Sequence, residues 1–216
     1  MAQPAACLFD LDGLLLDTEP LHGRAWHAAA AHFGLELEAA ALLQLRGRRR
    51  LDCAEIVLAW LHAAGLACPD AEALLAIRQP IAERLMAQAP AMEGAEALVR
   101  RCHDRDVPMA LATSSSAASV ALKGVAHPWL ELITIRVHGD DPELRAGKPA
   151  PDVFALAAAR LGVAPQACWA FEDSLAGARA AAAAGCRVHV LKSPAVSPAS
   201  LPPGVVLIDS LRAIQF

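Results

Sequence analysis

Several common signals of zinc, membrane and nucleic-acid binding are missing from this 216-residue sequence. No two of its six cysteines form a CxxC pair, which argues against a structural zinc site or a disulfide framework. No apolar run approaches the roughly 20 residues that a membrane-spanning helix needs, and the first ten residues lack the pattern of a secretory signal. The net charge of −4 gives no basic excess for a nucleic-acid partner. We therefore expect a cytoplasmic protein that binds neither membranes nor nucleic acids.

Lysine is also scarce. The chain has only three lysines, and none lies between residues 17 and 89. Lys148 differs from Lys123 and Lys192 because it follows a glycine and precedes a proline, in the stretch RAGKPAPD. A lysine in such a constrained loop is a candidate for a fixed ligand contact.

The remaining composition is typical of a globular protein. Hydrophobic residues make up 56% of the chain and charged residues 19%, which suffices for one core and a small second domain at this length. Short apolar runs alternate with alanine-rich helical segments, and this alternation predicts a doubly wound α/β fold with a parallel sheet. The expected strands are 6–9, 107–113, 132–139, 168–173, 186–191 and 205–208, and the expected helices between them are 94–105, 151–162 and 174–185.

One interval breaks the alternation. Between residues 17 and 89, the segments 19–34, 51–65 and 70–88 carry apolar residues at helical spacing, and no strand pattern is present. Pro90 and Gly94 mark the return to the α/β pattern. We therefore expect a small all-helical domain, residues 17–89, inserted after the first strand into a core formed by residues 1–16 plus 90–216.

Polar side chains gather where the expected strands end. The pairs are Asp10 with Asp12, Thr113 with Ser114, and Glu172 with Asp173. In a doubly wound sheet, ligands bind beyond the carboxyl ends of the strands, so these pairs and Lys148 should meet at one edge. Carboxylate oxygens suit a hard cation such as Mg²⁺, whereas hydroxyl groups and lysine suit phosphate oxygens. The sequence therefore predicts a site for Mg²⁺ and a phosphate group.

The chain resembles the haloacid dehalogenase superfamily of Mg²⁺-dependent phosphohydrolases over essentially its whole length. Four stretches in order resemble the motifs of that family: DLDGLLLDTE, ALATSS, GKPAPD and FEDSLAG. The helical insert directly after the first motif resembles the cap of the β-phosphoglucomutase-like branch. The stretch HGDDPELRAGKPAPDVF is further similar to pseudouridine-5′-phosphatase and its relatives.

The resemblance implies two catalytic carboxylates. Asp10 would attack phosphorus and form an aspartyl-phosphate. Asp12 would protonate the leaving oxygen and then deprotonate the water that hydrolyses the intermediate. The charge repulsion between these two acids would be relieved by Mg²⁺ and by their different roles.

The resemblance also implies the metal and phosphate ligands. Mg²⁺ would be bound by carboxylate oxygens of Asp10 and Asp173 and by the backbone carbonyl of Asp12. Glu172 would bind the ion through water or support Asp173. The phosphoryl group would be held by Thr113, Ser114 and Lys148.

Candidates for substrate contact in the helical insert are four basic residues, because a phosphorylated metabolite is anionic. They are His22, which occupies the histidine position of β-phosphoglucomutase-like caps, Arg46 and Arg48 in the run RGRRR, and Arg78. A solvated basic patch and a surface histidine are the alternatives.

The preferred substrate, a pseudouridine 5′-phosphate-like ester, rests on the resemblance alone. Phosphoglycolate, glycerol phosphate and deoxyhexose phosphates stay open.

Other functions have to be compared with phosphate hydrolysis, because related proteins share these motifs. Asp12 favours phosphate chemistry over dehalogenation, and the lack of lysine in residues 17–89 excludes a Schiff base of the phosphonoacetaldehyde hydrolase kind. A sugar phosphomutase remains open, because the sequence does not reveal how well a closed cap excludes water. A non-catalytic phospho-receiver module is the alternative of another class. We expect a monomer.

Overall fold

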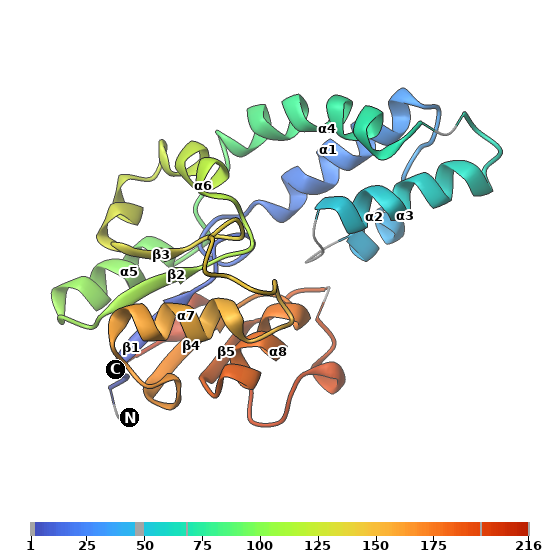
Figure 1. Cartoon of the computed structure of the whole chain (residues 1–216). Coiled ribbons are helices and arrows are strands. Elements are labelled where there is room, and N and C mark those ends of the chain that lie inside the picture. The colour runs from blue at the N-terminus through green and yellow to red at the C-terminus, as the bar shows by residue number, and fades with distance from the viewer. Residues whose placement is uncertain (1–2, 46–49, 68, 195, 216) are drawn as a thin grey trace. The chain divides into compact units, whose positions relative to one another are not determined.

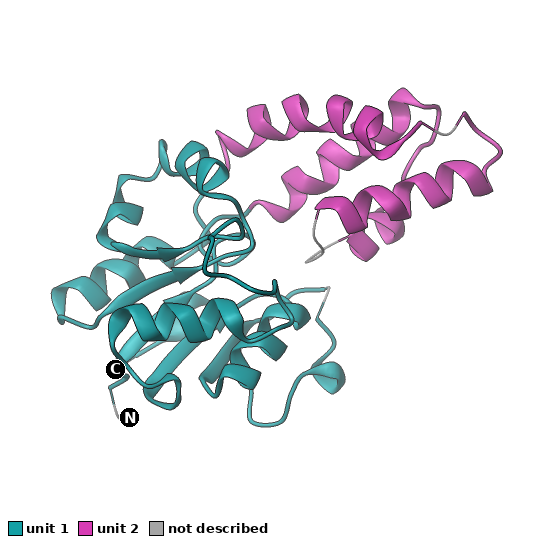
Figure 2. Ribbon diagram, viewed as in Figure 1, with its two compact units in different colours: residues 1–17, 90–216 teal, residues 18–89 magenta. Residues whose placement is uncertain are grey.

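The computed structural model describes residues 3–45, 50–67, 69–194 and 196–215. The chain divides into two compact units, Met1–Asp17 with Pro90–Phe216 and Thr18–Ala89 (Figure 2). We call the first the core unit and the second the helical unit.

The core unit is built on a six-stranded parallel sheet with the strand order β3-β2-β1-β4-β5-β6 (Figure 1). The strands are β1 (Ala6–Phe9), β2 (Met109–Ala112), β3 (Ile135–Val137), β4 (Cys168–Glu172), β5 (Arg187–Leu191) and β6 (Val206–Ile208). The predicted doubly wound α/β fold is thus confirmed. The strand order reverses at β1, so the ends of β1 and β4 lie at the position where such sheets bind ligands.

Helices cover both faces of the sheet, because alternate residues of each strand point to opposite faces. Cys7 and Phe9 of β1 pack with α5 (Ala95–Asp104), whereas Ala6 and Leu8 pack with α7 (Asp152–Leu161) and α8 (Leu175–Ala184). The side chains of β1, β2 and β4 are all buried. The strands therefore show no polar alternation, as expected for a sheet covered on both sides.

The helical unit contains α1 (Glu19–His32), α2 (Ala39–Leu45), α3 (Arg50–Ala63) and α4 (Ala71–Met86). They enclose a separate apolar cluster that includes Trp26, Val57, Leu61 and Leu74. The helical segment predicted after the first strand is therefore present, although α2 was not among the three expected helices. Within the described residues, no helix combines the length and apolar character needed to cross a membrane.

Two parts of the core unit differ from the sequence prediction. Strand β3 is shorter than the expected 132–139, because Pro128–Leu132 forms a 3₁₀ helix before it. Helix α6 (Ala117–Gly124) was not expected; the Ser116 hydroxyl caps its N-terminus by accepting the Ser119 N–H at 3.3 Å. This helix matters for the site because only residues 113–116 separate its start from the end of β2.

One histidine is buried in the sheet. His189 of β5 is 3% exposed and stacks on Phe171, with 5.0 Å between ring centroids, and its Nδ1 atom has no hydrogen-bond partner. Burial, reinforced by the charge of Arg187, lowers the pKa of His189 to about 4. The imidazole is therefore neutral in the folded protein at neutral pH and serves as a core residue.

This burial predicts a pH dependence of stability. The unfolded state binds a proton at His189 below a pKa of about 6.5, whereas the folded state resists it until about pH 4. The free energy of unfolding should therefore fall as the pH drops from 6.5 towards 4, by up to about 3 kcal/mol from this group. His189→Phe should remove that contribution, measured as the difference between wild-type and variant urea denaturation at pH 7 and pH 4.5. A difference that does not change with pH would contradict the assignment.

Candidate active site

Three carboxylates meet at the edge of the sheet where β1 and β4 end. Asp10 directly follows β1, and its N–H donates to the Phe171 carbonyl of β4 at 3.1 Å. Glu172 is the last residue of β4, and Asp173 is the next. One carboxylate oxygen from each of Asp10, Glu172 and Asp173 lies within 4.8 Å of the other two, and all three residues are buried. Because β1 and β4 are adjacent parallel strands, residues 162 and 163 positions apart in the sequence are brought into one acidic cluster.

Lys148 supplies positive charge to this cluster. Its Nζ donates to Asp10 Oδ1 at 2.5 Å and to Glu172 Oε1 at 2.6 Å, and its side chain is 7% exposed. Burial alone would lower the pKa of Lys148, but the charges of Asp10 and Glu172 outweigh burial and raise it. Lys148 is therefore a permanent cation at the site.

One lysine does not neutralise the cluster. Burial, together with the negative charges of Glu172 and Asp12, raises the pKa of Asp10 to about 7 against the opposing effect of Lys148. A divalent cation among these oxygens would supply the missing positive charge, and carboxylate oxygens are the ligands that hard cations prefer. The residues present therefore fit a divalent cation such as Mg²⁺.

Glu172 also organises the loop that carries Asp173. Its Oε2 accepts the Asp173 N–H at 3.1 Å and the Ser174 N–H and Oγ–H at 3.2 and 3.0 Å. A Cβ atom on Gly177 would lie 1.8 Å from Glu172 Oε1, so only glycine lets the first turn of α8 pack on this carboxylate. These contacts correspond to the second of the two roles considered for Glu172, which is support of Asp173.

The hydroxyl pair lies at the end of β2. Thr113 is buried, its N–H donates to the Val137 carbonyl at 3.1 Å, and its Oγ1 accepts the Ser115 N–H at 3.1 Å. No acceptor within the described part of the chain takes the hydroxyl proton of Thr113, which leaves it available for donation. Ser114 is exposed. The turn from β2 into α6 thus presents hydroxyl and backbone N–H groups, which are suitable donors to an anion.

Asp12 does not belong to the three-carboxylate cluster. Its carboxylate accepts hydrogen bonds from Lys123 Nζ at 2.7 and 2.8 Å and from Ser115 Oγ at 2.6 Å. Neither partner was predicted from the sequence. The only available signal for Lys123 was the scarcity of lysine, because helix α6 itself was not expected.

Two of the four basic candidates in the helical unit contact each other. Arg78 Nη2 lies 2.9 Å from His22 Nδ1, and the guanidinium lies 4.7 Å from the ring centroid of Trp26. Arg78 is 6% exposed, and burial lowers its pKa to about 10. Arg46 and Arg48 lie outside the described residues.

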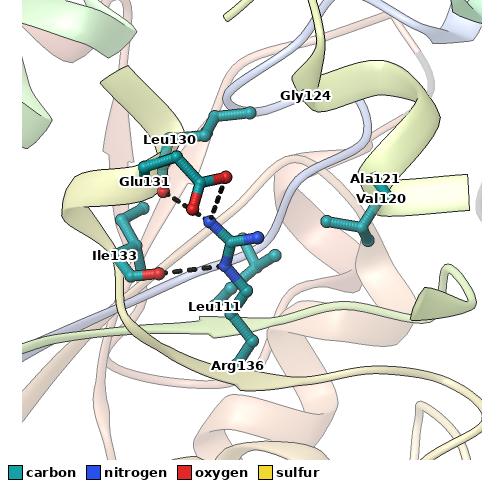
Figure 3. A pocket seen from close by; sticks show the side chains of 8 residues that line it. All are labelled: Leu111, Val120, Ala121, Gly124, Leu130, Glu131, Ile133 and Arg136. Atoms are coloured by element: carbon teal, nitrogen blue, oxygen red, sulfur yellow. Dashed lines mark hydrogen bonds and ion pairs between the residues drawn. The ribbon is translucent and has the colours of Figure 1, made fainter. Parts of the chain in front are cut away.

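A small cavity of about 30 Å³ lies elsewhere in the core unit, between α6, the Pro128–Leu132 turn and β3 (Figure 3). The Arg136 guanidinium beside it donates to the carbonyls of Ile133 and Leu130 at 3.0 and 2.9 Å and pairs with Glu131 at 3.1 Å. These contacts serve the fold, and the cavity contains none of the predicted site residues.

Known proteins with similar sequences or structures agree with the chemistry of the cluster. Residues 4–185 match the haloacid dehalogenase-like hydrolase family. The chain is 37% identical to the "probable pseudouridine-5′-phosphatase" of Drosophila melanogaster, over 88% of this chain and 83% of that protein. It is 36% identical to the fructose-1-phosphate phosphatase YqaB of Escherichia coli, over 84% and 93%. The crystal structure of CbbY from Rhodobacter sphaeroides in complex with phosphate superposes with a TM-score of 0.80 at 27% identity, covering 98% of this chain and 96% of that one. The chain belongs to the haloacid dehalogenase-like hydrolase family and is a phosphatase-type enzyme of that family.

Proposed function

We propose that the enzyme is a Mg²⁺-dependent phosphomonoester hydrolase that works through an aspartyl-phosphate on Asp10. The observation that carries this proposal is the acidic cluster of Asp10, Glu172 and Asp173 with Lys148 bonded to two of its members. Family membership supports hydrolysis of small phosphorylated metabolites. Mg²⁺ would be held by Asp10, Asp173 and the Asp12 carbonyl, and when bound it would neutralise phosphate and carboxylate charge.

In the first half-reaction, a carboxylate oxygen of Asp10 forms a bond to phosphorus. The bond from phosphorus to the ester oxygen breaks, and the proton of Asp12 moves to that oxygen, so the product leaves as an alcohol. Thr113, Ser114 and Lys148 donate hydrogen bonds to the phosphoryl oxygens during the transfer. Lys148 can do so because it already lies 2.5 Å from the attacking carboxylate.

In the second half-reaction, the Asp12 carboxylate takes a proton from water. The resulting hydroxide attacks phosphorus, the bond to Asp10 breaks, and inorganic phosphate leaves. Asp10 is again a carboxylate and Asp12 is again protonated, so the cycle is balanced. Asp12 therefore acts as acid and then as base, which requires its carboxylate to stay in one place through both steps.

We propose that residues 18–89 act as a cap domain that contacts the part of the substrate that is not transferred. His22 and Arg78, which contact each other, are the proposed contributors, because a paired histidine and arginine can bind oxygen atoms of an anionic or polyhydroxylated group. Arg46 and Arg48 remain proposals from the sequence alone.

The proposed substrate class follows from two relatives. Pseudouridine 5′-phosphate and fructose 1-phosphate both carry the phosphate on a primary hydroxyl group of a polyhydroxylated compound. Such an alkoxide is a poor leaving group, so its departure needs a general acid, which is the role given to Asp12. We therefore propose a phosphate ester of a primary alcohol as the natural substrate.

The stretch that suggested pseudouridine 5′-phosphate has a structural explanation. Arg160 pairs with Asp141 at 2.6 Å and with Glu143 at 2.7 Å, and Asp140 Oδ1 accepts the Ala117 N–H at the start of α6 at 2.9 Å. The hydrogen bond from Arg160 holds the pKa of Asp141 below its usual value. The acidic residues of GDDPE thus stabilise their own loop through Arg160 and bind the N-terminus of α6.

Gly139 in the same stretch contacts the phosphate-binding turn. Its N–H donates to the Ser115 carbonyl at 2.8 Å, and a Cβ atom at this position would lie 2.1 Å from the Ser114 carbonyl oxygen. Because that neighbour is backbone, the turn would have to shift to admit a side chain. The stretch therefore supports the turn that carries Ser114, and its resemblance gives little information about the sugar or base of the substrate.

The nucleophile is tested by Asp10→Asn, assayed for phosphate release from a panel of phosphorylated metabolites with Mg²⁺. We expect wild type to release phosphate and the variant to lose at least about 10³-fold in kcat, because an amide cannot attack phosphorus. Acid-quenched wild type should carry covalent phosphate, and the variant should not.

The matched control for this loss is Asp209→Asn, since Asp209 is exposed and, among the residues that the structure describes, pairs only with Lys192. Unchanged turnover in Asp10→Asn would overturn the proposal and favour a binding module. The mutase alternative is separated by β-glucose 1-phosphate with a trace of glucose 1,6-bisphosphate. Formation of glucose 6-phosphate without release of inorganic phosphate would overturn hydrolysis.

Metal binding should stabilise the fold. At a Mg²⁺ concentration of 100 times Kd, the gain in unfolding free energy is about 2.7 kcal/mol, which corresponds to a rise in Tm of about 5–10 °C for a chain of this size. EDTA should reverse the rise. Asp173→Asn should abolish it, whereas Asp209→Asn should keep it, as measured by thermal denaturation. A rise that is the same in Asp173→Asn would place the metal elsewhere.

Gly139→Ala should displace the turn at Ser114. We expect a loss of about 1–3 kcal/mol in unfolding free energy from the overpacked contact, together with a lower kcat/KM for phosphate esters. Gly124→Ala is the control, because a Cβ atom there would have no neighbour within 4 Å. Full activity in Gly139→Ala would show that the turn tolerates the shift.

A further inference from the structure

Lys123 is a buried lysine that has no role in the reaction steps proposed above. It lies near the end of α6 and is 1% exposed, although lysine is among the residues that are least often buried without a partner. Its Nζ donates to both carboxylate oxygens of Asp12, at 2.7 and 2.8 Å, and to Ser115 Oγ at 2.8 Å. The ammonium group has three protons, so these contacts account for all its donors.

Ser115 closes the arrangement into a triangle. Its Oγ accepts from Lys123 and donates to Asp12 Oδ2 at 2.6 Å. Asp12 is thus held by one cation and one hydroxyl, both from the segment that follows β2, whereas Asp10 and Glu172 are held by Lys148. The two aspartates of the DLD stretch thus pair with different lysines, Asp10 with Lys148 and Asp12 with Lys123.

We propose that Lys123, assisted by Ser115, is the positioning residue for Asp12, a role that rests on the proposed phosphohydrolase function. Asp12 must deliver a proton to the ester oxygen and later collect one from water, and a free carboxylate would rotate between these steps. The contacts from Lys123 to both carboxylate oxygens fix the place of the Asp12 carboxylate through both steps. Lys123 itself takes no part in the proton transfer.

This role makes the effect of Lys123 depend on the leaving group. Benzyl phosphate and p-nitrophenyl phosphate are similar in size, but benzyl alcohol needs a proton to leave and p-nitrophenolate does not. In the first half-reaction the proton moves from Asp12 to the ester oxygen only for the benzyl ester. Misplacing Asp12 therefore lowers kcat/KM for benzyl phosphate selectively, because kcat/KM covers the steps up to departure of the leaving group.

The test compares Lys123→Met with wild type on both esters in the presence of Mg²⁺. We expect kcat/KM for benzyl phosphate to fall by about 10²-fold, the scale of general acid catalysis, and that for p-nitrophenyl phosphate by less than about tenfold. Lys123→Met should also show a burst of one p-nitrophenolate per enzyme, because the slowed hydrolysis of the aspartyl-phosphate follows a normal first step. Lys192→Met, a variant of an exposed lysine, should behave as wild type.

Each outcome decides one question. Equal losses on both esters with no burst would reduce Lys123 to a structural residue and overturn the inference while leaving the proposed function intact. No phosphate release by wild type from either ester would overturn the proposed function, and this role with it. If Lys123→Met does not fold, Ser115→Ala decides: a smaller loss that is again selective for benzyl phosphate supports the inference, and an unselective loss overturns it.

Discussion

The structure depends on how buried negative charge is balanced at the ends of β1 and β4. Asp10, Glu172 and Asp173 place three carboxylates within 4.8 Å of one another, where burial disfavours their charged forms. Lys148 pairs with two of them and still leaves the pKa of Asp10 raised to about 7. The cluster is therefore short of positive charge. In the proposed function, a divalent cation supplies this charge and also neutralises the phosphate of the substrate.

Two lysines with buried side chains pair with the two neighbouring aspartates of the DLD stretch. Asp10 and Asp12 are separated by a single leucine, yet Asp10 pairs with Lys148 from the loop before α7 and Asp12 pairs with Lys123 from α6. In the proposed reaction, Asp10 as the nucleophile has to be unprotonated and close to phosphorus, whereas Asp12 as the acid–base group has to exchange a proton. Separate cations allow the two carboxylates to have different surroundings although they follow the same strand, which is how enzymes assign different roles to adjacent acids.

The sequence predicted the acidic cluster because parallel strands impose it. Once 6–9 and 168–173 are read as strands of one parallel sheet, Asp10 and Asp173 must emerge at the same edge, and no side-chain detail is needed. The Lys123–Asp12 pair was not predictable in this way. Helix α6 follows a turn, so the direction of a side chain near its end depends on where the helix begins, which Ser116 and Asp140 determine through hydrogen bonds to its N-terminus. The contact between His22 and Arg78 likewise requires the packing of α1 on α4.

The stretch 139–143 illustrates why a strong local resemblance can leave the substrate undetermined. Gly139 packs closely against the Ser114 carbonyl. The acidic side chains of the stretch form ion pairs with Arg160 and accept a hydrogen bond from the first turn of α6. All these contacts act on the turn that we propose to bind the phosphoryl group, and every phosphate ester has that group. Residues that support the transferred group are under the same physical constraint whatever alcohol is released. Specificity for that alcohol has to come from side chains that contact it, and the proposed candidates for such contacts lie in the helical unit.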